Sequence, residues 1–296
     1  MLHEDNARNR RIGIGLVTLT TLCFAALDTT AKWLVLSLPV FQVVWMRFFT
    51  HVLLTSALLA PVYGRELVRV RHPWLQALRA TMLASMTALN FWALQYLQLA
   101  ETGAIQFSVP LLIAMVSAWQ LGEHLDAKRW IAIVAGFVGV LLVIRPGSQA
   151  FHPAILLSVG NALVYAAFNI LTRRMAATES PAATQLMSGI GATIATAPFA
   201  WAHWVTPADW RTWALLAFCG LCGGLGHYFV ALAHRYGSAA RLGPFLYQQI
   251  VYMSLGGWLV FGQVPDRFVV LGAVVVVGSG LYLLWHEMRA EPPVES

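Results

Sequence analysis

The 296-residue sequence has little charge. Only 11% of its residues are Asp, Glu, Lys or Arg, whereas 58% are hydrophobic. A soluble domain carries about 25% charged residues, because its surface faces water. This chain cannot supply such a surface, so much of it is expected to be solvated by lipid. The composition therefore predicts an all-α integral membrane protein whose first partner is the lipid bilayer.

Cysteines and catalytic motifs are also scarce. The three cysteines, Cys23, Cys219 and Cys222, lie in apolar sequence and give neither a disulfide framework nor a zinc pattern. The chain contains no GxGxxG fingerprint, P-loop or nucleophile elbow. We therefore expect no cofactor, no metal and no catalytic residues.

Basic residues give the chain a pI of about 9.5, but they form no basic domain that would bind nucleic acid. They are spread over short connections, as the positive-inside rule describes. With a cytoplasmic N-terminus, the outer connections carry only Arg145, Arg211 and Arg267. The inner side then carries all of the following: Arg8, Arg10, Arg11, Arg65, Arg69, Arg71, Arg79, Lys128, Arg129, Arg173, Arg174, Arg235 and Arg289. This bias predicts that both termini are cytoplasmic.

Long apolar runs are abundant, and a membrane-spanning helix needs roughly 20 such residues. The first run follows three arginines, as in a signal peptide, but it is long and lacks a convincing cleavage site, so it is expected to be retained. The sequence predicts ten transmembrane helices, at residues 12–34, 40–61, 74–97, 101–121, 127–145, 153–175, 181–203, 211–235, 238–262 and 267–286.

The chain repeats itself at a spacing of about 140 residues. The segment Phe24–Lys32 returns as Tyr165–Arg173, and in both a polar or aromatic residue recurs every fourth position on one helix face. Further matches keep the spacing: Phe91–Leu94 with Phe229–Leu232, Pro39 with Pro181, and Gly122-Glu123 with Gly262-Gln263.

Each half, residues 12–145 and 153–286, holds five predicted helices. An odd number of helices turns the second half upside down in the membrane. The sequence thus predicts two inverted five-helix repeats, an arrangement typical of secondary transporters that bind solute near the membrane midplane.

These features resemble a known family. The two five-helix halves, Gly122-Glu123, the run Gly256–Gly262 and the cationic ends of helices one and six are similar to EamA-type members of the drug/metabolite transporter superfamily. Within it the chain most resembles the YddG type of amino-acid exporter, over about residues 12–286. The resemblance implies a bacterial inner-membrane exporter of small metabolites with a central cavity lined by helices one, three, four, six, eight and nine. Gln263 departs from the pattern, because the family usually has an acidic residue there.

Three charged residues are candidates for coupling or gating: Asp28, Lys32 and Arg47. Asp28 is the only carboxylate deep in a predicted helix, where charge is costly. It could bind a substrate ammonium group or a proton, but a structural ion pair with Lys32, four residues away, is slightly favoured. Arg47 could hold a substrate carboxylate, but a structural role, capping carbonyls or pairing with Asp28, is favoured.

Uncharged polar residues on the cavity helices are the candidates for substrate binding. Each alone is more often a helix-to-helix hydrogen-bonding group, but as a set some are expected to contact solute. Pro110 and Pro244 mark places where freed backbone carbonyls could face the cavity. The predicted substrate-binding residues are Asn90, Gln106, Asn161, Tyr165, Asn169, His227, Tyr247, Gln248 and Tyr252.

Together these features predict a monomeric secondary exporter of small zwitterions, above all neutral or aromatic amino acids, working by alternating access. Other metabolites or cationic drugs are the alternative substrates. Phosphorylated substrates would need more interior cations than Lys32, Arg47 and Arg241. A membrane enzyme is a further alternative, resting on the acidic and histidine cluster of Glu123, His124 and Asp126, but the second half has no matching cluster.

Overall fold

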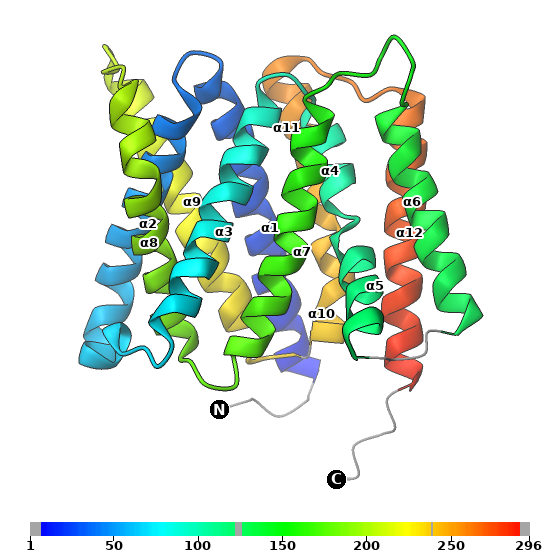
Figure 1. Cartoon of the computed structure of the whole chain (residues 1–296), viewed down its shortest axis with the longest axis horizontal. Coiled ribbons are helices and arrows are strands. Elements are labelled where there is room, and N and C mark those ends of the chain that lie inside the picture. Colours follow the sequence, from blue (N-terminus) through cyan, green and yellow to red (C-terminus); the bar gives the residue numbers. More distant parts are fainter. Residues whose placement is uncertain (1–6, 122–125, 238, 291–296) are drawn as a thin grey trace.

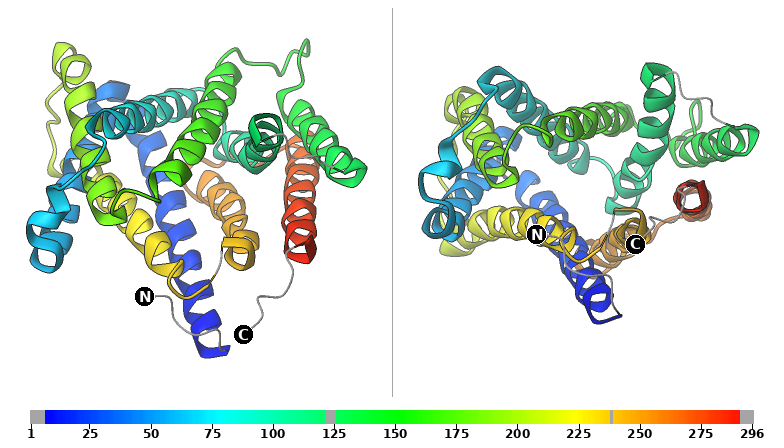
Figure 2. Two further views of the ribbon diagram at one scale, coloured as in Figure 1. Left: turned by 60° about the horizontal axis from the view of Figure 1, so that its bottom comes forward. Right: turned by 90° about the horizontal axis from the view of Figure 1, so that it is seen from below.

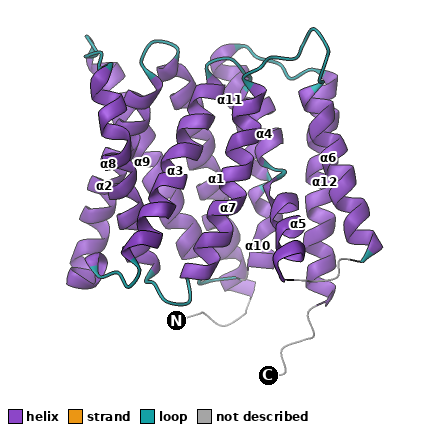
Figure 3. Ribbon diagram, in the orientation of Figure 1, coloured by secondary structure: helices purple, strands orange, loops and turns teal. Residues whose placement is uncertain are grey.

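The structure is a computed structural model that describes residues 7–121, 126–237 and 239–290 (Figure 1). Within these ranges the chain forms helices and no strand (Figure 3). The first half contains α1 (Ala7–Val35), α2 (Val40–Tyr63), the short 3-10 helix η1 (Gly64–Val68), α3 (Pro73–Leu94), α4 (Leu99–Gln106), α5 (Val109–Leu121) and α6 (Ala127–Ile144). The second half contains α7 (Ile155–Met175), α8 (Pro181–Ala202), α9 (Trp210–Ala233), α10 (Ala239–Leu246), α11 (Gln248–Phe261) and α12 (Arg267–Ala290).

Ten crossings result when α4 is taken with α5 and α10 with α11, which confirms the ten predicted helices. Among the described residues, seven segments are long and apolar enough by themselves to cross a membrane, and α4 with α5 is one of them. The fourth and ninth predicted helices are therefore each two shorter helices in line. The first break, at Phe107 and Ser108, lies just before Pro110, whose missing N–H interrupts the helix ladder there. The second break is at Tyr247, whereas Pro244 lies inside α10.

The packing of the helices follows the inverted repeat. α1 packs along α9, and its counterpart α7 packs along α3. Likewise α2 contacts α9, and its counterpart α8 contacts α3. Two helices pack directly on their own counterparts, α2 on α8 and α6 on α12. Both described chain ends lie on the same side of the bundle, as an even number of crossings requires (Figure 1).

Two apolar clusters form the interior. One joins α1, α2, α3 and α9, and the other joins α4, α6, α7 and α12. Tyr165 on α7 packs against both clusters. The centre of the protein is therefore the junction between two packed bodies, each built from helices of both halves.

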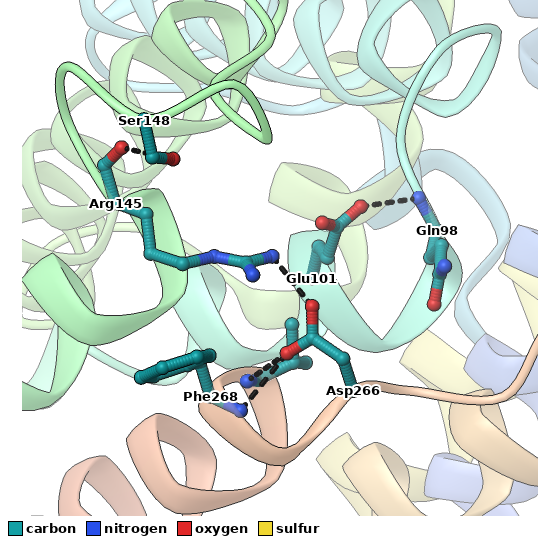
Figure 4. A network of polar contacts seen from close by, with 7 residues as sticks. Gln98, Glu101, Arg145, Ser148, Asp266 and Phe268 are labelled. Atoms are coloured by element: carbon teal, nitrogen blue, oxygen red, sulfur yellow. Dashed lines mark hydrogen bonds and ion pairs between the residues drawn. The ribbon is translucent and has the colours of Figure 1, made fainter.

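The α6–α12 pair stands at one edge of the bundle (Figure 2). At one end Arg145, just after α6, pairs with Asp266, just before α12, with nitrogen and oxygen 2.7 Å apart (Figure 4). At the other end Asp126, just before α6, pairs with His286 of α12 at 2.9 Å. The repeat thus places a carboxylate before each helix and a basic side chain at the far end of the other.

Candidate functional site

Asp28 lies buried at the junction of three helices. The carboxylate residue is only 4% exposed, and its Oδ1 accepts a 2.9 Å hydrogen bond from Asn90 Nδ2 of α3. The side-chain amide of Gln249 on α11 lies near enough to act on this carboxylate. α1 and α3 belong to the first half and α11 to the second, so Asp28 connects the two repeats. A buried carboxylate held by neutral amides keeps capacity to accept hydrogen bonds from a cation.

The expected ion pair between Asp28 and Lys32 is not formed. Lys32 Nζ instead donates to the carbonyl oxygens of Leu94 and Leu97, at 2.8 and 2.7 Å. These carbonyls lie at and just beyond the C-terminal end of α3, where the helix leaves acceptors unsatisfied. Lys32 therefore caps α3 and leaves Asp28 to the amides.

Arg47 is nearly as buried as Asp28, at 4% exposure. Its guanidinium lies over the ring of Phe48, 4.2 Å from the ring centre, and close to the backbone of Gly223 on α9. The charge of Asp28 acts on it, but no carboxylate of the described chain forms an ion pair with it. The predicted ion pair between Arg47 and Asp28 is thus not formed in this structure.

Arg79 is a second interior arginine. The loop-charge pattern predicts it at the inner surface, but the structure sets it inside α3, against α7 and α8. Its Nε donates to Thr172 Oγ1 at 2.8 Å, and its Nη1 donates to Ser188 Oγ and to the Thr184 carbonyl. The guanidinium stacks on Phe168, 4.3 Å from the ring centre. Arg79 is therefore an interior cation in addition to the three that the sequence predicts, Lys32, Arg47 and Arg241. The side chain of Arg241 lies outside the described residues.

The helix-six candidates on α7 form a partly buried stripe. Asn169 Nδ2 donates to the carbonyl of Tyr165, one turn back on the same helix, at 2.8 Å. Asn161 is 5% exposed, and the Tyr165 ring packs near Phe168. Tyr165 and Asn169 are thus held by their own helix.

His227 of α9 lies among rings. It meets Phe24 of α1 edge to face at 5.1 Å between ring centres, and His51 of α2 at 5.8 Å. Phe24 belongs to the repeated stripe on α1, whereas His51 has no sequence signal beyond its place in an apolar helix. These three rings line the junction of α1, α2 and α9.

The helix-nine candidates divide between two directions. Gln248 Oε1 accepts hydrogen bonds from Tyr252 at 3.1 Å and from Thr18 of α1 at 3.2 Å. The Tyr247 hydroxyl instead meets Gly280 of α12 and has no hydrogen-bond partner among the described residues. Gln248 and Tyr252 therefore face α1, whereas Tyr247 faces the α12 side.

Gln106 ends α4 at the break and is partly buried. In a continuous helix the backbone N–H of residue 110 would donate to the Gln106 carbonyl. Pro110 has no N–H, so the Gln106 carbonyl loses this helical hydrogen bond. The ring of Phe107, the next residue, packs on Tyr247 with centres 5.1 Å apart. The two helix breaks are therefore in contact.

A cavity of about 370 Å³ lies beside the first break, between α5, α6 and α7. Its walls are apolar except at Ser108, and Leu141 and Leu163 at its rim are more than half exposed. It opens sideways toward lipid and contains no predicted site residue. The solute candidates lie instead in the packed junction of the halves.

The residues of the enzyme alternative are only partly in view. Glu123 and His124 lie outside the described residues, as does Gly122. Asp126 accepts the backbone N–H of Arg129 at 2.8 Å and so caps α6. Among the described residues, no three His, Cys, Asp or Glu side chains gather as metal ligands.

Inverted helical repeats whose broken helices meet at their interface are the architecture of a secondary membrane transporter. The chain belongs to the EamA-like transporter family, whose model matches residues 11–145 and again 152–285. This membership makes the chain a multi-pass membrane transporter of metabolites and counts against the enzyme alternative.

Curated relatives match nearly the whole chain. An S-adenosylmethionine uptake transporter of Rickettsia conorii is 28% identical and covers 97% of each chain. A riboflavin transporter of Rhizobium johnstonii is 26% identical over 95% of this chain and 93% of the relative. The pseudopaline exporter CntI of Pseudomonas aeruginosa is 28% identical over 90% of this chain and 93% of the relative. A crystal structure with 18% identity shares the fold, with a TM-score of 0.64 over 97% of this chain and 100% of that chain.

Proposed function

We propose that this protein exports small zwitterionic metabolites, amino acids first among them, across the bacterial inner membrane by alternating access. The observation that carries the proposal is the buried carboxylate of Asp28, which contacts α3 of its own half and α11 of the other. A substrate ammonium group would complete its hydrogen bonding and offset the cost of burying the charge.

Neutral polar groups and rings surround this carboxylate. Asn90 Oδ1 is buried and has no hydrogen-bond partner within the described part of the chain. Phe24, Tyr165 and Tyr252 border the junction of the halves. Amides suit the paired charges of a zwitterion, and rings suit an apolar or aromatic side chain. S-adenosylmethionine, the substrate named for one relative, joins an amino-acid head group to a ring system.

Direction is part of the proposal. Transporters named for uptake and for export both occur among the relatives, so the fold does not fix direction. We take the basic side as cytoplasmic, with both termini there, and the flow as outward.

The experiment is flux through proteoliposomes that contain the purified protein. We expect labelled phenylalanine and S-adenosylmethionine to move and riboflavin to move poorly. Asp28→Asn is expected to lower phenylalanine flux at least ten-fold, because a charge-assisted hydrogen bond is lost. The control is Glu179→Gln, which changes another buried carboxylate, one that binds the backbone N–H groups of Arg71 and His72. Its flux is expected to stay within two-fold of wild type.

Two outcomes contradict the proposal. If no zwitterion moves while riboflavin does, the substrate class is wrong. If phenylalanine moves equally through wild type and Asp28→Asn, this carboxylate is not the ammonium site. Direction is tested in bacterial cells that overproduce the protein, where export predicts faster efflux of preloaded phenylalanine and resistance to a toxic amino-acid analogue.

A further inference from the structure

Arg47 presents unused hydrogen-bond donors inside the protein. Its Nε and Nη1 are buried and have no partner among the described residues. An unpaired buried charge costs several kcal/mol unless something compensates it. The aromatic face of Phe48 supplies part of that compensation, but a ring accepts no in-plane N–H bonds.

Arg79 shows that this fold can satisfy a half-buried guanidinium. It donates to the oxygens of three neutral partners, Thr172, Thr184 and Ser188. In the register of the repeat, about 140 residues, Arg79 corresponds to Cys219 and Ser188 corresponds to Arg47. The two arginines therefore occupy equivalent junctions of the repeat, α3 with α8 and α2 with α9. The corresponding neighbours of Arg47 are Cys219 and Gly223. The thiol of Cys219 is a weak hydrogen-bond acceptor, and Gly223 has no side chain to accept a bond.

His51, one turn from Arg47 on α2, adds a third unused nitrogen. The side chain is 2% exposed, and its Nδ1 has no partner among the described residues. It lies between Gly189 of α8 and Gly224 of α9. In the tautomer with its proton on Nδ1, His51 is a donor on the same helix as the guanidinium.

α9 packs closely against Arg47. A Cβ on Gly223 would lie 3.2 Å from Arg47 Nε, which is closer than an ordinary contact. The glycine thus lets the α9 backbone approach the guanidinium, and any larger side chain there would press on Nε. Asp28 is near enough for its charge to act on Arg47, yet the two do not form an ion pair. One anionic and one cationic group are held close together and unpaired.

We infer that Arg47, assisted by His51, is the subsite for the substrate carboxylate, beside the ammonium site at Asp28. This inference rests on the proposed zwitterion transport and adds the position of the second charge. A carboxylate would accept a charge-assisted hydrogen bond from Nε or from Nη1, which lie on different edges of the planar guanidinium. Substrate binding would then neutralise both buried charges at once.

The test compares three solutes that differ only in their charged groups: phenylalanine, phenethylamine, which lacks the carboxylate, and 3-phenylpropionate, which lacks the amine. In wild-type proteoliposomes phenylalanine is expected to be preferred over phenethylamine by ten- to a hundred-fold, as befits charge-assisted bonds. In Arg47→Gln this preference is expected to fall to about two-fold, through loss of phenylalanine flux and not of phenethylamine flux. Arg47→Lys, which keeps the charge but not the paired donors, is expected to fall between them.

Arg79→Gln is the matched control, since it removes a half-buried arginine from the equivalent junction. It is expected to lower all fluxes equally or not at all and to keep the preference for phenylalanine. If Arg79→Gln erases the preference as Arg47→Gln does, or if Arg47→Gln keeps it, the subsite is wrong while the proposed function stands.

A binding measurement tests the subsite without transport. We expect 3-phenylpropionate to raise the melting temperature of the detergent-purified wild type and of Arg79→Gln, and to leave that of Arg47→Gln unchanged. The melting-temperature shift tests the subsite even if the wild type moves no amino acid. Absence of flux would overturn the proposed function but not the subsite. Equal stabilisation of Arg47→Gln, or none of wild type, would overturn the subsite.

Discussion

The rings of Phe107 and Tyr247 pack with their centres 5.1 Å apart, and each residue lies at the break of its own helix. In the register of the repeat the two are equivalent positions. The interrupted backbones of the two halves thus meet across the centre of the molecule. Broken helices at such an interface offer a place where the halves can move relative to one another without unwinding a continuous helix.

Tyr247 is held from its other side by Gly280 of α12. A Cβ at position 280 would collide with the Tyr247 hydroxyl. Gly280→Ala is therefore expected to lower the stability by about 1–3 kcal/mol, the usual cost of overpacking. The measurement is the melting temperature of the purified protein in detergent.

The control is Gly278→Ala in the same helix, where an added Cβ meets nothing within 4 Å. It is expected to be neutral or to stabilise by up to about 1 kcal/mol, because alanine favours helix more than glycine. Tyr247→Phe in the Gly280→Ala background should restore part of the loss by removing the hydroxyl. Equal melting temperatures for the two alanine variants would contradict this account of the contact.

The helices and their inverted order could be predicted from sequence because apolar length and loop charge are local signals. The break before Pro110 agrees with the missing proline N–H, whereas the second break lies at Tyr247, three residues after Pro244. The partner of Lys32 could not be predicted, because spacing along α1 favours Asp28, whereas the carbonyls of Leu94 and Leu97 come near only through the packing of α3. The partners of Arg79 could not be predicted for a related reason. Its position near a chain turn suggests water, but α7 and α8 fold over it.

Lys32 is expected to contribute stability and not selectivity. Lys32→Met removes two hydrogen bonds to the carbonyls at the end of α3, and a charged donor contributes about 1.5–3 kcal/mol. We expect a loss of that order in thermal unfolding, with unchanged preference among transported solutes.

A double-mutant cycle tests whether Lys32 is independent of Asp28. Since the two are not paired, the losses from Lys32→Met and Asp28→Asn should add, with a coupling energy under about 0.5 kcal/mol. A coupling of 1 kcal/mol or more, measured by unfolding of the two single variants and the double variant, would show that they act as an ion pair after all.

The ion pair of Asp266 with Arg145 predicts how acid affects the α6–α12 pair. Partial burial raises the pKa of Asp266, but the backbone N–H groups of Val269 and Phe268 and the Arg145 guanidinium outweigh it, so the pKa lies below its usual 3.8. A lowered carboxylate pKa stabilises the folded state above the unfolded value, and this stabilisation is lost as pH falls through the folded value. The contribution of Asp266 is therefore full at neutral pH and disappears well below 3.8.

Asp266→Asn separates the ion pair from the helix cap. Its side-chain oxygen can still accept the N–H groups of Phe268 and Val269, as the carboxylate does at 2.9 and 3.0 Å, while the charge facing Arg145 is lost. We expect a loss of up to about 1 kcal/mol at pH 7, since the pair is partly exposed. Melting temperatures of wild type and variant should converge as the pH is lowered toward 3. A gap that persists unchanged at low pH would mean that the aspartate acts through packing and not through its charge.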